Sequence, residues 1–349
     1  MAGIGVRLNK IFGRNTLTTN MIGFFYSTLV TVAPMFAIII NLVLMEYFLK
    51  FSTLGYAQRE LFSCTILYTF IFSLLTASPF NAVLSRYISD VIYEERYQDI
   101  LPCYHIGMML NIVLSCLVGI PFCLWEHFVG GVSVAYVFAG FWCYISLVFV
   151  FYSMIYLSIC KDYQRIAQYY IVGMLVAFFL SLFLRYICHW GITQSMLAAM
   201  DAGFFLTAVL ENALVKRYFR KNSNRYKPVL SYFKMYWQLV VTNFLYILGL
   251  YVHNFVFWTT DMRMVVVDSF VCNQPYDMAS CLAMFTNISA TIIFIARVEM
   301  YFHEKYKLYS EAVIGGRGAD IQNAKKRMFR QLASELMTLA RIQFIISVV

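Results

Sequence analysis

Charged side chains are scarce in this chain. Asp, Glu, Lys and Arg make up only 13% of its 349 residues, whereas 61% are hydrophobic. A water-soluble surface of this size requires far more charge, so the composition excludes an ordinary soluble domain. The hydrophobic runs are long and continuous and do not alternate with period two, which disfavours a transmembrane β-barrel. The sequence therefore predicts an all-α polytopic membrane protein.

Metal-binding cysteine pairs are also missing. None of the nine cysteines belongs to a C-x-x-C motif, and most of them lie within hydrophobic runs. We interpret them as small, reduced side chains packed inside helices. A disulfide between Cys272 and Cys281, bridging a predicted outer loop, is the less favoured alternative.

Catalytic motifs are absent from the sequence. It contains no H-E-x-x-H, G-x-x-x-x-G-K-[ST] or G-x-S-x-G motif, no G-x-G-x-x-G after a strand, and no Asp-x-Asp that would hold a metal-bound sugar nucleotide. Glu299, His303 and Glu304 have a helical spacing that could bind a metal, but a solvated helix end explains them more simply. Residues 315–318 are glycine-rich and predict a flexible loop rather than a phosphate site. We predict no enzyme activity, no cofactor and no metal.

Long hydrophobic segments alternate with charged turns and predict nine transmembrane helices, the last of them incomplete. The segments cover about residues 20–49, 61–87, 103–125, 132–160, 166–188, 195–215, 230–258, 278–296 and 331–349. Residues 1–19 are basic and amphipathic, and we expect them to lie on the inner membrane face. Pro79 is expected to kink the second helix.

Two charged helix endings resemble each other and predict an internal repeat. Arg86 follows one uncharged stretch and Arg297 follows another, an offset of 211 residues, and residues 93–97 align with residues 302–306. We therefore expect two related helical bundles. The N-terminal bundle covers residues 20–220 and holds six helices.

The second bundle is predicted to be incomplete in this chain. It covers residues 221–349 and holds the seventh and eighth helices with the start of a ninth. If it repeats the first bundle, about three more helices are expected beyond residue 349.

Lys and Arg are distributed unevenly between the two sides of this predicted path. One side, which includes the N-terminal segment and the run 216–234, carries 22 of the 27, and the other side carries Lys50, Arg59, Arg185 and Arg263. The positive-inside rule therefore places the N-terminus in the cytoplasm. This topology and anionic membrane lipid explain the net charge of +9, so nucleic acid is not an expected partner.

Ionisable groups within the predicted helices are candidates for a transport path. Asp201 and Glu211 lie in the sixth helix, and Arg86 and Arg297 lie near the inner ends of the second and eighth helices. An ionised group inside a bilayer costs about 2 to 4 kcal/mol on insertion scales, so each should face a partner or water. For the two arginines, snorkelling to lipid headgroups is an equally good explanation.

Polar and aromatic side chains form stripes on three of the predicted helices. The first helix carries Asn20, Ser27, Thr31, Pro34 and Asn41, the seventh carries Tyr236, Asn243, Asn254 and Trp258, and the eighth carries Ser280, Asn287 and Thr291. Aromatic faces combined with amides suit sugar rings, which present C–H faces and hydroxyls together. Packing between helices through small polar residues is the alternative explanation.

Several short motifs resemble those of a known family. They are Ala2-Gly3-Ile4-Gly5, Arg86-Tyr87-Ile88-Ser89-Asp90 with Tyr93, Ile100-Leu101-Pro102, Lys161-Asp162-Tyr163, Phe257-Trp258, Tyr276-Asp277, and Arg297-Val298-Glu299 before Phe302 and Tyr306. These residues resemble the PelG family of membrane transporters for the Pel exopolysaccharide, which are related to the multidrug/oligosaccharidyl-lipid/polysaccharide (MOP) flippases. The sequence departs from that pattern at Ala33-Pro34-Met35, where Gly-Pro-Trp is expected.

The resemblance implies a MATE-like fold of two six-helix bundles related by a pseudo-two-fold axis. It also implies export of a cationic, partly deacetylated N-acetylgalactosamine-rich polymer across the bacterial inner membrane during biofilm matrix synthesis. The implied partners are a cytosolic glycosyltransferase and a membrane protein that senses cyclic di-GMP.

As a mechanism, we hypothesise that the polymer enters at a cytoplasmic mouth lined by Arg86, Asp90, Arg297 and Glu299. It would then pass along the first, second, seventh and eighth helices. Two alternatives remain open. One is a lipid-linked oligosaccharide or small-molecule antiporter, for which Asp201 is the coupling candidate, and the other is a non-transporting membrane scaffold of the polysaccharide synthase, which needs no polar interior.

Overall fold

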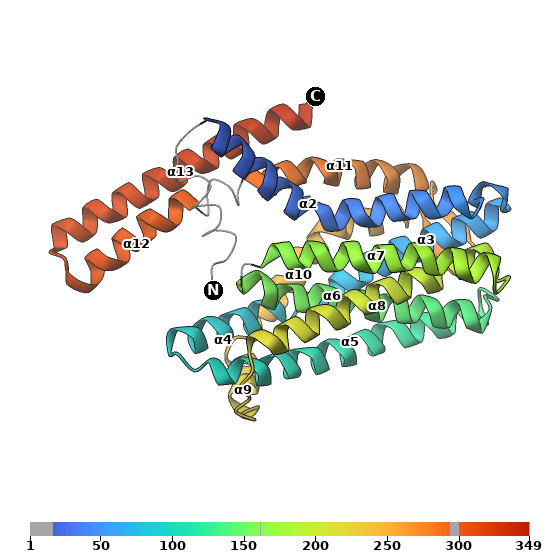
Figure 1. Ribbon diagram of the computed structural model, residues 1–349, viewed down its shortest axis with the longest axis horizontal. Helices are drawn as coiled ribbons and strands as arrows, with labels where there is room; N and C mark the ends of the chain where they lie inside the picture. The colour runs from blue at the N-terminus through green and yellow to red at the C-terminus, as the bar shows by residue number, and fades with distance from the viewer. Residues whose placement is uncertain (1–16, 161, 294–299, 349) are drawn as a thin grey trace. The chain divides into compact units, whose positions relative to one another are not determined.

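A computed structural model of the chain describes residues 17–160, 162–293 and 300–348, and its secondary structure is almost entirely helical (Figure 1). The chain divides into two compact units, one built from residues 33–274 and the other from residues 1–32 with 275–349. The first unit contains every residue that lines the two cavities described below.

Helices account for nearly all of the larger unit. They are α2 (Leu17–Phe48, shared with the other unit), α3 (Tyr56–Ala77), α4 (Asn81–Tyr93), α5 (Ile100–Phe128), α6 (Val134–Ile159), α7 (Tyr163–Tyr186), α8 (Ile192–Tyr218), α9 (Lys227–Met235) and α10 (Trp237–Phe257), with short 3-10 turns η1 (Phe51–Thr53) and η2 (Tyr97–Asp99). Within the described residues, six helices are long and apolar enough to cross a membrane, namely α3, α5 together with η2, α6, α7, α8 and α10. These six candidates fall in the second to seventh predicted transmembrane segments.

Two of the predicted helices are broken rather than continuous. The second ends at Ala77 and resumes at Asn81, because Pro79 stops the helix instead of only kinking it. The seventh is divided at Tyr236, where φ is −118° and ψ is 33°, into a short α9 and the long α10. No proline or glycine marks that second break, so no residue type in the sequence indicates it.

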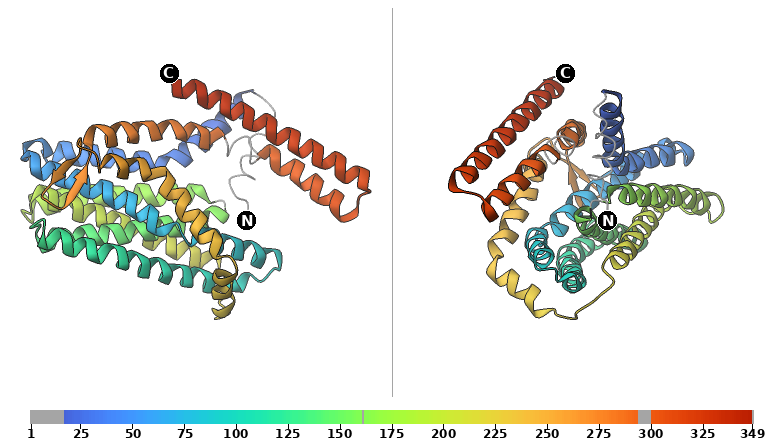
Figure 2. Two further views of the ribbon diagram at one scale, coloured as in Figure 1. Left: turned by 180° about the vertical axis from the view of Figure 1, so that it is seen from behind. Right: turned by 60° about the vertical axis from the view of Figure 1, so that its left-hand side comes forward.

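Close helix packing forms the centre of the larger unit. Helices α5, α6, α7 and α8 run side by side, with α8 packed on α6 and α7 (Figures 1 and 2). Gly173 and Gly203 allow α7 and α8 to approach each other, since a Cβ atom on Gly203 would lie 2.7 Å from the carbonyl oxygen of Gly173. Buried aromatic residues, among them Tyr104, Tyr152 and Phe204, fill the spaces between these helices.

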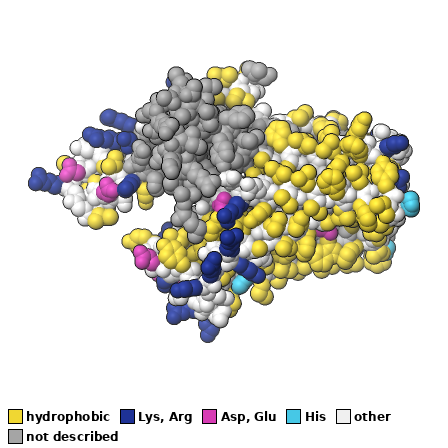
Figure 3. Space-filling model, viewed as in Figure 1, with side chains coloured by type: hydrophobic (Ala, Val, Ile, Leu, Met, Phe, Trp, Pro, Cys, Tyr) yellow, Lys and Arg dark blue, Asp and Glu magenta, His cyan; other side chains and the backbone are white. Residues whose placement is uncertain are grey.

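The two ends of this unit differ in charge. We call the end that carries α4, η2 and residues 219–226 the basic end, and the end that carries the turns after α2, α5 and α7 the opposite end. Lys and Arg side chains gather around α4 and α9, whereas hydrophobic side chains cover the flanks of the helices (Figure 3). This distribution is typical of a protein that crosses a bilayer.

A small antiparallel hairpin follows α10 at the opposite end. Strands β1 (Met264–Val266) and β2 (Phe270–Cys272) pair with Val265 opposite Val271. The turn between them places Val267 and Asp268 at φ values of 51° and 52°. A valine in this region is unusual because its branched side chain crowds the backbone, so packing elsewhere must hold the hairpin in place.

The smaller unit contains α11 (Gln274–Ile293, of which Gln274 belongs to the larger unit), α12 (Met300–Gly315) and α13 (Gly318–Val348). Helices α12 and α13 form an antiparallel pair joined by a tight turn at the glycine-rich run, for which the sequence predicts a flexible loop. In the described residues, neither α11 nor α13 meets the length and hydropathy criteria that the six membrane-crossing helices meet. The eighth and ninth transmembrane helices therefore stay predictions.

The proposed equivalence of the two charged endings is not reproduced. Residues 93–97 do end a helix, and Glu95 has a φ of 58° there, whereas residues 302–306 lie inside α12. After the first ending a new helix, α5, begins at Ile100, whereas α12 continues past the second to Gly315. The two-bundle arrangement accordingly stays a prediction as well.

Candidate functional site

The predicted cytoplasmic mouth is only partly visible in the structure. Arg86 and Asp90 form an ion pair within α4, with 3.4 Å between Nε and Oδ2. The hydroxyl of Tyr232 in α9 donates to the same carboxylate at 3.1 Å, so Asp90 connects α4 to α9. Arg297 and Glu299 lie outside the described residues.

A second carboxylate at the basic end is not among the predicted site residues. Asp99 is fully buried, pairs with Arg96 at 2.9 Å, and accepts a hydrogen bond from Ser223 in the linker between α8 and α9. The backbone N–H of Ser223 also donates to the carbonyl of Gln98 at 3.0 Å. These bonds tie the linker 219–226 to the start of α5, although the linker itself is not helical.

The two acids of α8 occupy separate environments. Asp201 accepts a hydrogen bond from Ser146 of α6 at 2.9 Å, and Glu211 is completely buried without a hydrogen-bond partner for either carboxylate oxygen within the described part of the chain. Ten residues of helix separate them by about 15 Å. They therefore do not converge on one site.

The polar stripes of the first and seventh helices contribute to helix packing. Asn41 places its amide nitrogen 3.5 Å from the sulfur atoms of both Met174 and Met200. Asn243 donates to the carbonyl oxygen of Ser78 at the break between α3 and α4, where the backbone N–H of Asn81 donates to the same oxygen at 3.0 Å.

The remaining members of the predicted path are buried or not described. Trp258 stacks on Tyr68 of α3 with 4.8 Å between ring centroids, and Asn254 is also buried. The side chain of Asn287 lies outside the described residues. The packing explanation thus accounts for Asn41 and Asn243, and the passage along these helices stays a prediction.

A cavity with several charged and hydroxyl-bearing residues in its walls lies at the opposite end of the larger unit. We call it the polar cavity. Its volume is about 650 Å³, and it lies between the end of α2, the turn after it and the start of α3. The residues that line it are Val43, Glu46, Tyr47, Phe51, Ser52, Tyr56, Arg59, Glu60, Ser63 and Gln274.

Two carboxylates and two tyrosines give the polar cavity its chemistry. Glu60 is 6% exposed, and its Oε1 accepts a hydrogen bond from the side-chain amide of Gln274 at 3.1 Å. Glu46, Tyr47 and Tyr56 are exposed on the walls. Carboxylates, an amide and aromatic faces together can bind a ring that presents both hydroxyls and C–H groups.

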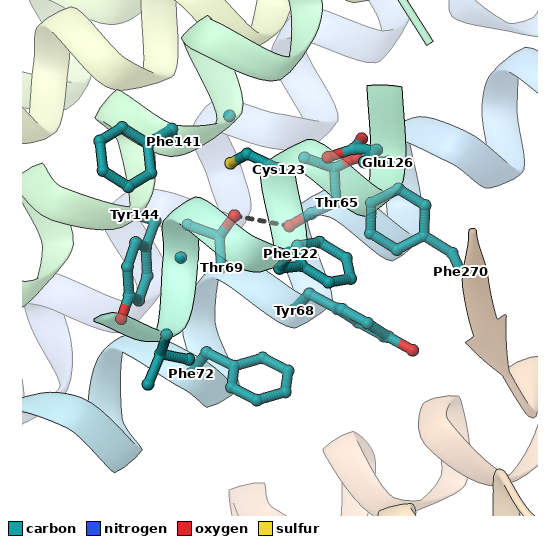
Figure 4. A pocket seen from close by; sticks show the side chains of 13 residues that line it. Thr65, Tyr68, Thr69, Phe72, Phe122, Cys123, Glu126, Phe141, Tyr144 and Phe270 are labelled. Carbon is teal, nitrogen blue, oxygen red and sulfur yellow. Dashed lines mark hydrogen bonds between the residues drawn. The ribbon is translucent and has the colours of Figure 1, made fainter. Parts of the chain in front are cut away.

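An aromatic pocket lies between α3, α5 and α6, and Phe270 of the hairpin closes one wall (Figure 4). Its volume is about 270 Å³. The lining residues are Thr65, Tyr68, Thr69, Phe72, Val118, Gly119, Phe122, Cys123, Glu126, Gly140, Phe141, Tyr144 and Phe270. Phe270 packs against Tyr68 and Phe122, with ring centroids 5.0 Å and 5.4 Å away.

The cysteines give no support to a metal or disulfide site. No disulfide forms among the nine, all of which lie in the described part of the chain, so Cys272 and Cys281 are not bridged. Within the described residues, no group of three His, Cys, Asp or Glu side chains has a geometry that could hold a metal ion.

Comparison with known proteins assigns the chain to a family. A family model described as PelG, "Putative exopolysaccharide Exporter (EPS-E)", matches residues 1–349, the whole chain. The chain belongs to the PelG family. No curated protein and no solved structure matches it. This PelG chain is therefore a multi-pass membrane protein of an exopolysaccharide exporter family, as its motifs indicated.

The acids that line the two cavities of this PelG chain were not among the predicted site residues. Glu46 is the single charged residue in the hydrophobic run of the first helix, and Glu126 lies in the last turn of α5. The feature of the sequence that could have identified Glu46 and Glu126 is that each acid lies among apolar residues. Which acids would meet across a cavity depends on helix packing, and no periodicity in the sequence encodes that.

Proposed function

We propose that this PelG chain carries the Pel exopolysaccharide out of the cytoplasm during biofilm matrix synthesis. The polymer would be cationic and rich in N-acetylgalactosamine, the membrane would be the bacterial inner membrane, and the N-terminus would be cytoplasmic. A cytosolic glycosyltransferase and a membrane protein that senses cyclic di-GMP would deliver the polymer. The family match and the six apolar helices support an exporter, and the polar cavity is the observation that supports a saccharide as its cargo.

The lining of the polar cavity fits an amino sugar. Tyr47 and Tyr56 offer aromatic faces to the C–H groups of a sugar ring, and Glu46 and Glu60 accept hydrogen bonds from hydroxyl or ammonium groups. Two carboxylates against the single guanidinium of Arg59 leave a negative excess, which favours a cationic residue of the polymer.

The position of the polar cavity suits the exit of the path. It lies at the opposite end, where Lys and Arg are few, and under the positive-inside rule that end would lie outside the cytoplasm. Sugar residues leaving the membrane would bind there before release. The basic end, where Tyr232 donates a hydrogen bond to Asp90, would face the glycosyltransferase that delivers the polymer.

Secretion by full-length variants tests the proposal. In a host that lacks its own transporter but has the other synthase components, we expect Glu46→Gln combined with Tyr47→Ala to lower secreted amino-sugar polymer about tenfold. The loss of a charge-assisted hydrogen bond and a ring contact is worth about 1.5 to 3 kcal/mol. Asp261→Asn, which removes an exposed carboxylate from the loop after α10, is the matched control.

The outcome separates the proposal from its alternatives. Normal secretion by the double variant at equal protein level would remove the polar cavity from the transport path and favour the scaffold. The antiporter would be favoured by a different pair of results. The double variant would lose secretion, and proteoliposomes that contain the chain but no glycosyltransferase would show proton-coupled efflux of small cations. Asn243→Leu is unsuitable for this purpose, because it also removes the hydrogen bond to Ser78 that stabilises the break between α3 and α4.

A further inference from the structure

The lining of the aromatic pocket excludes a ligand with many polar groups. Thr65 donates to the carbonyl of Leu61 and Thr69 to the carbonyl of Thr65, which are both bonds within α3. The hydroxyl of Tyr68 donates to Val271 of the hairpin, and that of Tyr144 donates to Thr76. Since the O–H groups of these side chains already donate within the protein, they have no donor left for a bound sugar, and the sugar's oxygen atoms would lose the hydrogen bonds that water donates to them without replacement.

Glu126 is the exception to this apolar lining. This residue is 5% exposed, and its buried Oε1 has no hydrogen-bond partner among the described residues. The neighbouring His127 does not supply one, because its Nδ1 lies 2.9 Å from the carbonyl of Val132. A buried carboxylate without a donor is costly, so the geometry calls for a donor that comes from outside the chain.

The pocket has a polar end and an apolar end, separated by about the depth of one membrane leaflet. Figure 4 shows Glu126 at one end and Phe72 at the other. Glu126 lies in the last turn of α5, at the opposite end of the unit, whereas Tyr144 lies ten residues into α6, which starts at that same end. Ten helical residues span about 15 Å, which is half of a hydrocarbon core of about 30 Å.

We propose that the aromatic pocket binds one phospholipid with a primary ammonium headgroup, of the phosphatidylethanolamine class, drawn from the surrounding bilayer. Its ammonium group donates to Glu126, and one acyl chain lies among the rings of Phe72, Phe122 and Phe141. The carboxylate selects an N–H donor, so phosphatidylcholine, whose quaternary ammonium has no N–H, and anionic phosphatidylglycerol bind less well. The hairpin covers the bound chain through Phe270.

This inference does not rest on the identity of the exported polymer. It needs only that the α3, α5 and α6 helices lie in a bilayer, and the lipid measurement uses no saccharide. A failure of the secretion experiment would leave it unaffected.

Lipid retention by the purified protein provides the test. The full chain would be reconstituted in bilayer discs with equal amounts of phosphatidylethanolamine, phosphatidylcholine and phosphatidylglycerol, extracted, and analysed by native mass spectrometry. For the wild type we expect phosphatidylethanolamine to be retained about tenfold over the other two. Glu126→Gln should abolish this selectivity while leaving some lipid bound, and Asp261→Asn should behave like the wild type.

Two further measurements test whether the lipid binds in the aromatic pocket itself. Cys123→Phe, which fills the pocket from α5, should lower retention of all three lipids. In the unmutated protein, phosphatidylethanolamine should slow alkylation of the Cys123 thiol by a small apolar maleimide, read out by peptide mass spectrometry, so the test does not depend on a variant that folds. Equal retention of the three lipids by the wild type, or selectivity that survives Glu126→Gln, would overturn the proposal.

Discussion

The packing of α7 on α8 depends on two residues that lack side chains. A Cβ atom on Gly203 would lie 2.7 Å from the carbonyl oxygen of Gly173 and 2.8 Å from the Cβ atom of Ala177. The first of these neighbours is backbone, so the two helices would have to move apart. Gly203→Ala is therefore expected to destabilise the protein by about 1 to 3 kcal/mol, measured as a lower melting temperature in detergent.

The control for this prediction is another helical glycine. Gly249 lies within α10, and an added Cβ atom there meets nothing within 4 Å. Gly249→Ala should leave the melting temperature unchanged or raise it slightly, since alanine favours a helix over glycine by about 1 kcal/mol. If both variants melted at the same lower temperature, close packing at Gly203 would not be the cause.

Single polar residues were easier to place in a helix than to assign a role. Hydropathy placed Asn41, Asn243 and Asp201 correctly inside long apolar helices. It could not supply their partners, because Ser78 offers a carbonyl to Asn243 only where α3 breaks, and Ser146 meets Asp201 only once α6 packs on α8. Contacts between residues so far apart in sequence leave no local pattern.

Among the secondary-structure elements, the hairpin is bonded to α3 through two tyrosine hydroxyls, that of Tyr56 to the sulfur atom of Met264 at 3.3 Å and that of Tyr68 to Val271. The hydroxyl of Tyr68 donates to the carbonyl of Val271 at 2.6 Å and accepts from the N–H of the same residue at 3.1 Å. Tyr68→Phe removes both bonds and should speed amide hydrogen exchange in the peptide 264–272 about two- to tenfold, as the loss of about 0.5 to 1.5 kcal/mol implies.

A matched hydroxyl deletion elsewhere serves as the control. Tyr186 also donates to a backbone carbonyl, that of Phe48 at 2.7 Å, at the same end of the unit but away from the hairpin. Tyr186→Phe should leave exchange in the hairpin peptide unchanged. Unaltered exchange in the Tyr68→Phe variant would show that Phe270 and its neighbours hold the hairpin without the hydroxyl.

Helix existence could be predicted from the sequence, whereas helix continuity could not. Hydrophobic length alone defines a membrane-crossing helix, and α5, α6, α7 and α8 follow the predicted ranges to within a few residues. The break at Tyr236 involves no proline or glycine, and the charged segment 302–306 continues as helix where residues 93–97 stop. Both outcomes depend on tertiary packing and on the residues that come next in the chain.

The orientation of the larger unit in the membrane determines on which side of the bilayer its two cavities lie. Basic side chains gather near α4 and α9 (Figure 3), and the residues that line the polar cavity and the aromatic pocket belong to the helix segments toward the opposite end. Electrostatic retention of Lys and Arg on the cytoplasmic side predicts that the linker 219–226 is inside and the loop after α10 is outside.

Protease accessibility in intact cells tests this orientation. A cleavable tag inserted after Asp261 should be cut when protease is added to spheroplasts, whereas the same tag inserted after Lys221 should be cut only after lysis. Both insertions fall in exposed, non-helical segments, so the fold should tolerate them. The reverse pattern would place the polar cavity on the cytoplasmic side, where it would act in polymer entry, and Glu126 would then meet lipid of the inner leaflet.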